Sequence, residues 1–206
     1  MSGPVFSMGL STYKVPFSLH RTNRTKVMER IQHSTFSYAK HSLIVLHGGK
    51  SYNRNDTDHE PIFRQESYFH YLFGVKEPDF YGLLDIKTNE CILFCPRYPK
   101  EYATWMGTIL LPNDFCDMYG VDGVKYVDEL EEYLEDLLKK RSVENDVHKD
   151  HQEGSKLLLL RGQNSDSGNW YEPPKFQSDY LNKQIDTEML FKILADARVF
   201  KSEEEL

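Results

Sequence analysis

The sequence is short of cysteine and contains no long apolar run, and each shortage excludes a class of protein. Its three cysteines, Cys91, Cys95 and Cys116, are few and odd in number, which argues against a disulfide framework and indicates a reducing compartment and a cytoplasmic protein. No apolar stretch approaches the roughly 18 residues that a membrane-spanning helix needs. Residues 1–21 lack the apolar core of a signal peptide. No membrane association is therefore expected.

Basic residues are also in the minority. The 206 residues include 25 Lys and Arg against 32 Asp and Glu, which gives a net charge of -7 at pH 7. Because nucleic-acid binding usually needs a clustered basic face, no nucleic-acid partner is expected. Aromatic residues are plentiful instead, with 12 Phe and 13 Tyr, and 39% of all residues are hydrophobic. That supply suffices for the core of one large domain.

Apolar runs and helical stripes alternate along the chain. Four short runs, at 42–49, 80–86, 91–96 and 156–162, are predicted strands, and the middle two form a hairpin. Two helices are predicted from apolar stripes, one from Leu130, Tyr133, Leu134, Leu137 and Leu138, the other from Leu190, Ile193, Leu194 and Ala197. Strands that are apolar throughout are typical of a sheet buried on both faces. We therefore expect an α/β fold, a mixed sheet with helices on both faces.

Polar residues indicate where these helices begin and where a loop lies. Asp128 and Glu131 form a capping-box pattern at the start of the first stripe, and Asp186 is a candidate cap for the second. Residues 139–155 are charged and lack apolar periodicity, which predicts a mobile loop.

A second capping-box pattern stands at the end of the sequence. Ser202 is followed by Glu205 three residues later, so the chain is expected to end one turn into a helix. A single helical turn is unstable on its own because nucleation costs more than one hydrogen bond returns. We therefore expect residues 202–206 to be poorly ordered or held by something outside their own domain.

Clustered acids and histidines offer one candidate metal site. Asp56, Asp58, His59 and Glu60 share a polar loop, and His70 follows at some distance. Their spacing matches no common metal motif, so we interpret them as solvated charges. No metal ligand is predicted in this chain.

Two further patterns are interpreted as structural. Cys91 and Cys95 are four residues apart on a predicted strand, so both point to the same face and behave as small buried hydrophobes. The segment GQNSDSGN, residues 162–169, has the residues that tight turns require. It has neither a nucleophile elbow nor a phosphate loop. No catalytic residue is predicted.

Trp105 leaves two interpretations open. It lies between small or polar neighbours, including Thr104 and Gly107, in the stretch EYATWMGTI. A core tryptophan is the favoured interpretation from the residues alone, and Trp170 has the same claim. The other interpretation is an aromatic ring presented at a surface, where it offers a large contact area with few rotatable bonds.

Several stretches, spread from Lys14 to Leu206, together resemble one family, the eukaryotic prolidases. These Xaa-Pro dipeptidases belong to the "pita-bread" group with aminopeptidase P and creatinase. The stretches are KVPFSLHRTNR, IVLHGG, FRQESYFHYLFGV, EPDFYGLLDI, FCPRYPKEYATWMGTI, YVDEL, LRGQNSDSG and ARVFKSEEEL. FRQES-YF is typical of the wider group, whereas ATWMG and RG-N-DSG point to prolidase itself.

The resemblance implies a domain organisation. Residues 1–197 would form a non-catalytic N-terminal domain with a ribonuclease H-like architecture. Residues 198–206 would be the linker and the first helical turn of a catalytic domain that is absent from this chain. That absent domain would hold two divalent metal ions, usually manganese, on two Asp, one His and two Glu, and none of these ligands can be assigned here.

The resemblance also implies an activity and a role for one residue. The whole enzyme would be a homodimer that hydrolyses dipeptides with a C-terminal proline, and this fragment alone would be inactive. The tryptophan of the ATWMG stretch, Trp105 here, would reach the substrate pocket of the neighbouring subunit. The alternatives are a non-catalytic protein-binding module with the same architecture and the N-terminal domain of an aminopeptidase P.

Overall fold

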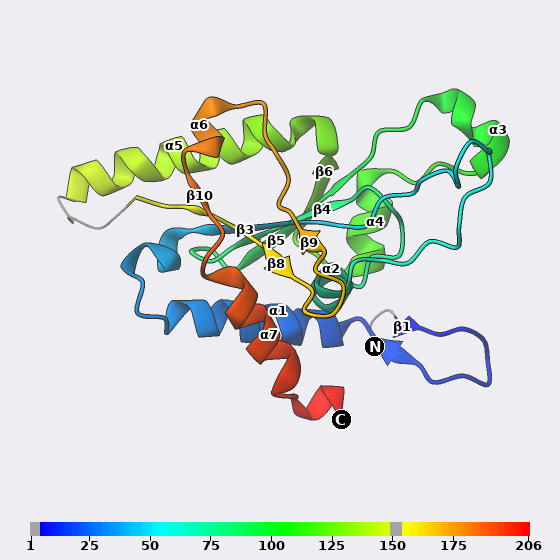
Figure 1. The fold of residues 1–206 in the computed structure, drawn as a ribbon, viewed down its shortest axis with the longest axis horizontal. Helices are drawn as coiled ribbons and strands as arrows, with labels where there is room; N and C mark the ends of the chain where they lie inside the picture. The colour runs from blue at the N-terminus through cyan, green and yellow to red at the C-terminus, as the bar shows by residue number, and fades with distance from the viewer. Residues whose placement is uncertain (1–4, 149–153) are drawn as a thin grey trace.

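The central feature of the computed structural model, which describes residues 5–148 and 154–206, is a six-stranded sheet (Figure 1). Its strands lie in the order β10-β7-β3-β4-β5-β6. The bounds are β3 Leu43–His47, β4 Tyr81–Asp85, β5 Glu90–Cys95, β6 Gly123–Tyr126, β7 Leu157–Leu159 and β10 Ile185–Asp186. Strand β4 runs antiparallel to β3 and β5, and the other pairs are parallel. The mixed sheet is therefore confirmed.

Helices cover both faces of this sheet, as predicted (Figure 1). One face carries α1 (Ser18–Gln32), α2 (Ser67–Phe73), α4 (Pro112–Tyr119) and α7 (Leu190–Val199). The other carries α5 (Leu130–His148) and α6 (Asp179–Asn182). Side chains of β3 alternate between the two apolar clusters, Ile44 on the first face and Leu43 and Val45 on the second. This alternation explains why the strands are apolar throughout.

The smaller elements lie around this framework. Two short hairpins pair β1 (Val5–Phe6) with β2 (Val15–Pro16) and β8 (Gly162–Gln163) with β9 (Trp170–Tyr171). Short helical turns are η1 (Ser37–His41), η2 (Lys100–Tyr102), α3 (Ala103–Met106), η3 (Val127–Glu129) and η4 (Glu203–Glu205). In the described part of the chain, no helix combines the length and apolar character that crossing a membrane requires.

Helix α5 extends further than predicted. It runs to His148, so the prediction of a loop is wrong for residues 139–148, while residues 149–153 lie outside the described residues. Lys139 forms an ion pair with Glu135 one turn earlier, and Arg141 is buried against Asp85 of β4. The helix beyond Leu138 is therefore supported by ion pairs, one of them buried against a distant strand, and not by an apolar stripe.

The start of α5 differs from the predicted capping box. Asp128 forms an ion pair with Arg97, and Glu129 accepts a hydrogen bond from the Tyr126 backbone N–H at 2.8 Å. Glu131 instead accepts bonds from the backbone N–H groups of Gln177 and Ser178. The bond from Glu129 to the Tyr126 backbone lies two residues earlier than the predicted box, at the start of the 3-10 turn η3 that precedes the helix.

Asp186 forms the hydrogen bonds that are expected of a cap before α7. The carboxylate of Asp186 accepts hydrogen bonds from the backbone N–H groups of Glu188 at 3.0 Å and Met189 at 3.3 Å. The regular helix then begins at Leu190. Leu190, Leu194 and Ala197 are buried, as the apolar stripe predicts.

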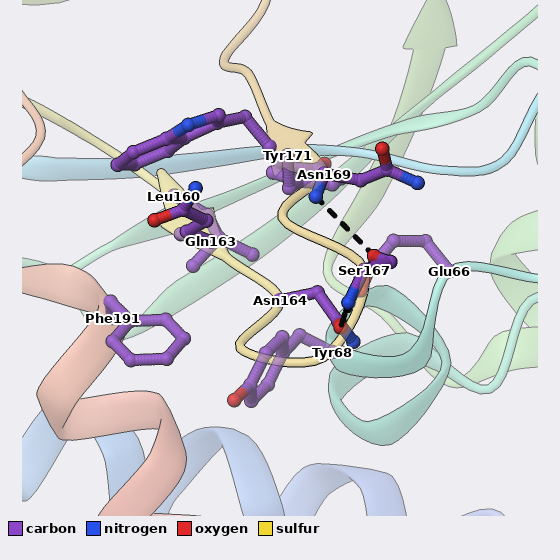
Figure 2. A pocket seen from close by; sticks show the side chains of 11 residues that line it. Glu66, Tyr68, Leu160, Gln163, Asn164, Ser167, Asn169, Tyr171 and Phe191 are labelled. Atoms are coloured by element: carbon purple, nitrogen blue, oxygen red, sulfur yellow. Dashed lines mark hydrogen bonds between the residues drawn. The ribbon is translucent and has the colours of Figure 1, made fainter.

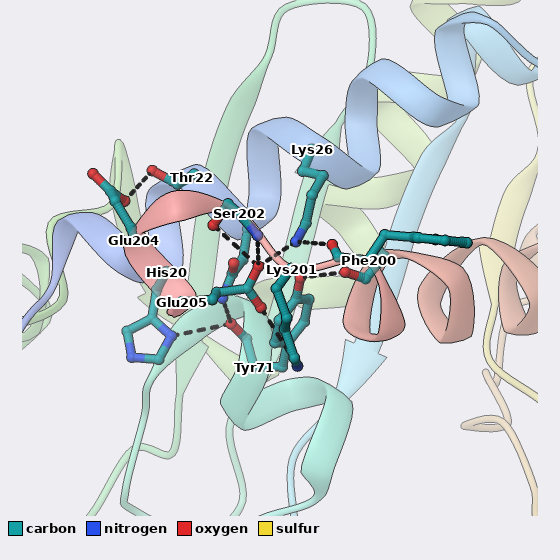
Figure 3. Close-up of polar contacts among 11 residues, drawn as sticks. His20, Thr22, Lys26, Tyr71, Phe200, Lys201, Ser202, Glu204 and Glu205 are labelled. Atoms are coloured by element: carbon teal, nitrogen blue, oxygen red, sulfur yellow. Dashed lines mark hydrogen bonds and ion pairs between the residues drawn. The ribbon is translucent and has the colours of Figure 1, made fainter.

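The last residues pack on α1 of their own domain, so the expectation that they lack such support is wrong (Figure 3). Lys26 of α1 forms an ion pair with Glu205, and Thr22 donates a hydrogen bond to Glu204 at 2.6 Å. Glu205 also accepts from the Ser202 backbone N–H at 2.8 Å, which is one half of the predicted capping box. Contacts with α1 thus hold this short turn in place.

Candidate functional site

Trp105 lies on α3, at the tip of an arm that projects from the body of the molecule (Figure 1). We call residues 97–111, between β5 and α4, the arm. The Trp105 side chain is 80% exposed, so the interpretation as a core tryptophan is wrong. Trp170 is 49% exposed, so it is not a core residue either. A large aromatic ring on a projecting tip is suited to contact with another molecule.

The base of the arm is fixed by charge. Arg97 donates two hydrogen bonds to Asp128, at 2.8 Å and 3.2 Å, and its guanidinium lies 3.6 Å from the centre of the Tyr126 ring. The bond with Asp128 raises the pKa of the Arg97 guanidinium and lowers the pKa of the Asp128 carboxyl. The arm is therefore attached to β6 and η3 where it leaves the sheet.

A hollow of about 500 Å³ lies between the β8–β9 hairpin, α2 and α7 (Figure 2). Aromatic side chains of Tyr68, Tyr171 and Phe191 line it together with the amides of Gln163 and Asn164. The sequence predicts residues 162–169 only as a turn. That the turn also lines a hollow was not predicted, because the other lining residues lie on α2 and α7, which are distant in sequence.

Within that hairpin, the polar side chains bond to one another. The Asn164 side-chain oxygen accepts hydrogen bonds from the backbone N–H groups of Asp166 at 3.0 Å and Ser167 at 2.8 Å. The Ser167 hydroxyl donates to the same oxygen at 3.2 Å. These bonds, with those between the backbones of Asn164, Gly168 and Asn169, form the tight turn that the residues of the segment predict.

The acidic and histidine residues of the sequence do not converge. Asp56, Asp58, His59 and Glu60 are exposed, and Glu60 accepts a hydrogen bond from the Ser51 hydroxyl at 2.6 Å. In residues 5–148 and 154–206, no three His, Cys, Asp or Glu side chains come together as metal ligands would. The side chains described here therefore do not fit a two-metal site.

His70 lies away from that loop, on α2, where its ring meets the ring of His20 at 5.7 Å in an edge-on arrangement. Burial lowers the pKa of both imidazoles. His20 also contacts the carbonyl oxygen of Tyr71 through Nδ1 at 3.0 Å. Both rings are therefore predominantly neutral near pH 7.

Cys91 and Cys95 are buried on one face of β5, as predicted. Burial raises the pKa of the Cys91 thiol to about 12 and that of Cys95 to about 11. Since the thiolate is the nucleophile and the metal ligand, these thiols are chemically inert at neutral pH.

The fold and the sequence define the class. The chain belongs to the family described as aminopeptidase P, N-terminal domain, whose model matches residues 20–148. It is 39% identical over 207 residues to the Xaa-Pro dipeptidase of Pongo abelii. The aligned region covers 100% of this chain and 38% of that protein. The chain thus spans about 38% of the length of this relative.

Solved structures agree on the fold. The Pseudomonas aeruginosa aminopeptidase PepP superimposes with a TM-score of 0.50 at 25% identity, over 60% of this chain and 27% of that one. A Bacillus anthracis protein superimposes with a TM-score of 0.60 at 17% identity, over 91% of this chain and 41% of that one. The family resemblance in the sequence is confirmed.

Proposed function

We propose that this chain is the N-terminal, non-catalytic domain of a cytoplasmic Xaa-Pro dipeptidase, a hydrolase of dipeptides with a C-terminal proline. The observation that carries the proposal is the exposure of Trp105 at the tip of the arm. The 39% identity to an Xaa-Pro dipeptidase along the whole chain supports the substrate class. Inert, buried thiols agree with a reducing compartment.

In this proposal the enzyme is a homodimer, and Trp105 of one subunit enters the substrate pocket of the other. Residues 1–197 form the domain, and residues 198–206 lead from α7 into the catalytic domain. The contacts of Glu204 and Glu205 with α1 then fix the direction in which the linker leaves this domain (Figure 3).

The two divalent metal ions of such an enzyme, for which we propose manganese, have no ligand set among the described residues. We assign them to the catalytic domain. Bound there, the ions would supply the Lewis-acid chemistry that hydrolysis of the peptide bond needs. No step of this chemistry falls to the residues of this chain.

The contribution of Trp105 is to binding. Its indole ring supplies an apolar wall against the pyrrolidine ring of the substrate and excludes water from the pocket. In this proposal the arm of one subunit narrows the substrate pocket of the other, so that only a short substrate fits. This limits the enzyme to dipeptides.

Kinetics of a variant of the full-length enzyme test this role. Trp105→Ala should lower kcat/KM for Gly-Pro while leaving the melting temperature and the metal content unchanged. Tyr13→Ala, which removes an exposed ring from the β1–β2 hairpin, is the matched control and should change neither quantity. A large loss of stability with unchanged kinetics would contradict the pocket role, because emptying a buried aromatic site costs about 3–5 kcal/mol.

A pure sample of residues 1–206 should not hydrolyse Gly-Pro, with or without manganese. Turnover that a chelator abolishes would overturn the assignment of catalysis to another domain.

The family match favours one alternative, the N-terminal domain of an aminopeptidase P. Such an enzyme removes the residue before proline from longer peptides. Comparing Gly-Pro with Gly-Pro-Ala as substrates of the full-length enzyme separates the two. Preference for the tripeptide would favour the alternative.

A further inference from the structure

Two tyrosine rings connect Trp105 to the body of the molecule. The rings of Tyr102 and Trp105 are 6.4 Å apart at 70°, an edge-on contact. The rings of Tyr98 and Tyr102 are 5.7 Å apart at 21° and are stacked. Both distances lie within the range of about 4.5–7 Å in which aromatic rings attract one another. We call Tyr98, Tyr102 and Trp105 the aromatic ladder.

The lower end of the ladder, Tyr98, is half-buried. Tyr98 lines a hollow of about 180 Å³ together with Phe80, Met106 and Phe115. Phe80 and Phe115 are core residues in edge-on contact at 5.0 Å. Burial also raises the pKa of the Tyr98 hydroxyl. The ladder therefore runs from the core, through Tyr98, to the exposed indole.

The backbone around Trp105 has little support of its own. Helix α3 has only four residues, and the 3-10 turn before it has three. Gly107 ends the helix with φ +76°, and nothing lies within 4 Å of the position that a Cβ atom would occupy there. A helix this short is unstable by itself. Side-chain contacts must therefore fix the position of the indole.

Contacts between the aromatic rings hold the members of the aromatic ladder together. Among the described residues, no hydrogen bond to another protein group is found for the Tyr98 hydroxyl or the Tyr102 hydroxyl. The Tyr102 ring contacts both of its neighbours, stacked on Tyr98 and edge-on to Trp105. A phenylalanine at position 102 would preserve these ring contacts.

We propose that Tyr102, stacked on Tyr98, is a positioning residue that holds the indole of Trp105 in the orientation that an Xaa-Pro dipeptide requires. This inference rests on the proposed function of Trp105. Without the Tyr102 ring, Trp105 stays on the arm but samples several orientations, and ordering it then weakens substrate binding.

The expected effect is moderate and specific to the ring. Loss of one aromatic contact corresponds to roughly a two- to twelvefold change in an equilibrium. In the full-length enzyme, Tyr102→Ala should lower kcat/KM for Gly-Pro by about that factor, with the melting temperature within a few degrees of the parent. Tyr102→Phe should restore the parent kcat/KM.

The double variant tests whether Tyr102 acts through Trp105. Because Tyr102 has no role once the indole is gone, Tyr102→Ala/Trp105→Ala should have the same kcat/KM as Trp105→Ala alone. A further loss in the double variant would contradict the inference, since Tyr102 would then act on substrate or fold by another route.

A direct readout of the indole comes from fluorine NMR of the enzyme labelled with 5-fluorotryptophan. The Trp105 resonance is assigned by its absence from Trp105→Phe. Tyr102→Ala should move this resonance toward the position of a solvated indole, and Tyr102→Phe should leave it in place. An unmoved resonance in Tyr102→Ala would overturn the inference.

The two proposals fail in different ways. If Trp105→Ala keeps the parent kcat/KM, the proposed function of Trp105 is wrong. If Trp105→Ala is impaired while Tyr102→Ala matches the parent, only the positioning role is wrong.

Discussion

Arg141 on α5 forms an ion pair with Asp85 at the end of β4, and the two side chains are only 6% and 5% exposed. Arg141 also donates a hydrogen bond to the carbonyl oxygen of His41 at 2.6 Å, and Asp85 accepts from the backbone N–H groups of Lys87 at 2.9 Å and Thr88 at 3.2 Å. One buried pair thus joins the long helix, the β4–β5 turn and the end of η1, just before β3.

Removing one partner of this pair should be costly. Arg141→Ala leaves the Asp85 carboxylate buried and uncompensated, which typically destabilises a protein by about 3–5 kcal/mol. Urea unfolding measures the change in the free energy of unfolding. The control is Asp85→Asn/Arg141→Met, which removes both charges and keeps an acceptor for the turn, and it should cost clearly less. If both variants lose the same free energy of unfolding, the loss in Arg141→Ala does not come from the uncompensated charge of Asp85.

The contact between Lys26 and Glu205 predicts a pH window for the end of the chain. Burial opposes ionisation of the Glu205 carboxyl, but hydrogen bonds from Lys26 and Ser202 outweigh it and lower its pKa below the ordinary 4.5. Burial likewise opposes the charge on Lys26, and the bond to Glu205 raises its pKa above the ordinary 10.5.

The signs of these two shifts set the window. A lowered carboxyl pKa stabilises the contact above about pH 4.5 and this stabilisation is lost as the pH falls through the folded value. A raised amine pKa stabilises it below about pH 10.5 and this is lost as the pH rises through the folded value. Hydrogen exchange of residues 202–206 should therefore be slowest, after correction for intrinsic rates, between these limits.

Lys26→Met tests the same contact by mutation. It keeps the aliphatic stem and removes the charge, so amides of residues 202–206 should exchange about three- to tenfold faster at pH 7. Lys40→Met, a substitution on a different surface, is the control. Unchanged exchange in Lys26→Met would show that other contacts hold the turn.

The cysteines predict a pattern of reactivity. Burial raises the pKa of the Cys91 and Cys95 thiols to about 12 and about 11, so neither should react with a thiol reagent in the native protein at pH 8. Cys116 is half-buried, and its thiol should react first. All three should react in denaturant. Labelling of Cys91 or Cys95 ahead of Cys116, located by peptide mass spectrometry, would contradict the burial argument.

Much of the fold can be predicted from local patterns. The strands at Leu43–His47, Tyr81–Asp85 and Glu90–Cys95 are apolar runs bounded by turn residues, and the stripe from Leu130 marks α5. These signals are local because burial on two sheet faces demands an unbroken apolar strand. Helix α4 was missed, although Pro112 at its start and Gly120 after its end are helix boundary signals.

The remaining features depend on contacts between distant residues. The extension of α5 needs Arg141 to meet Asp85, and the ordering of the chain end needs Lys26 to meet Glu205. The exposure of Trp105 follows from the arm leaving the sheet, and local composition favoured a core position. The family resemblance implied an exposed Trp105, as observed, because it carries information about a neighbouring subunit that a single sequence lacks.

The most direct test of the account uses mixed dimers of the full-length enzyme. One subunit carries Trp105→Ala with an intact catalytic domain, and the other carries Trp105 with an inactivated catalytic domain. If Trp105 serves the neighbouring subunit, the active site in this dimer receives the indole of its partner, and its kcat/KM for Gly-Pro should equal the parent value per active site. The reciprocal dimer, which pairs a parent subunit with one carrying both changes, should be as impaired as Trp105→Ala itself. Impairment of the first dimer and parent activity of the second would contradict the account, because Trp105 would then act within its own subunit.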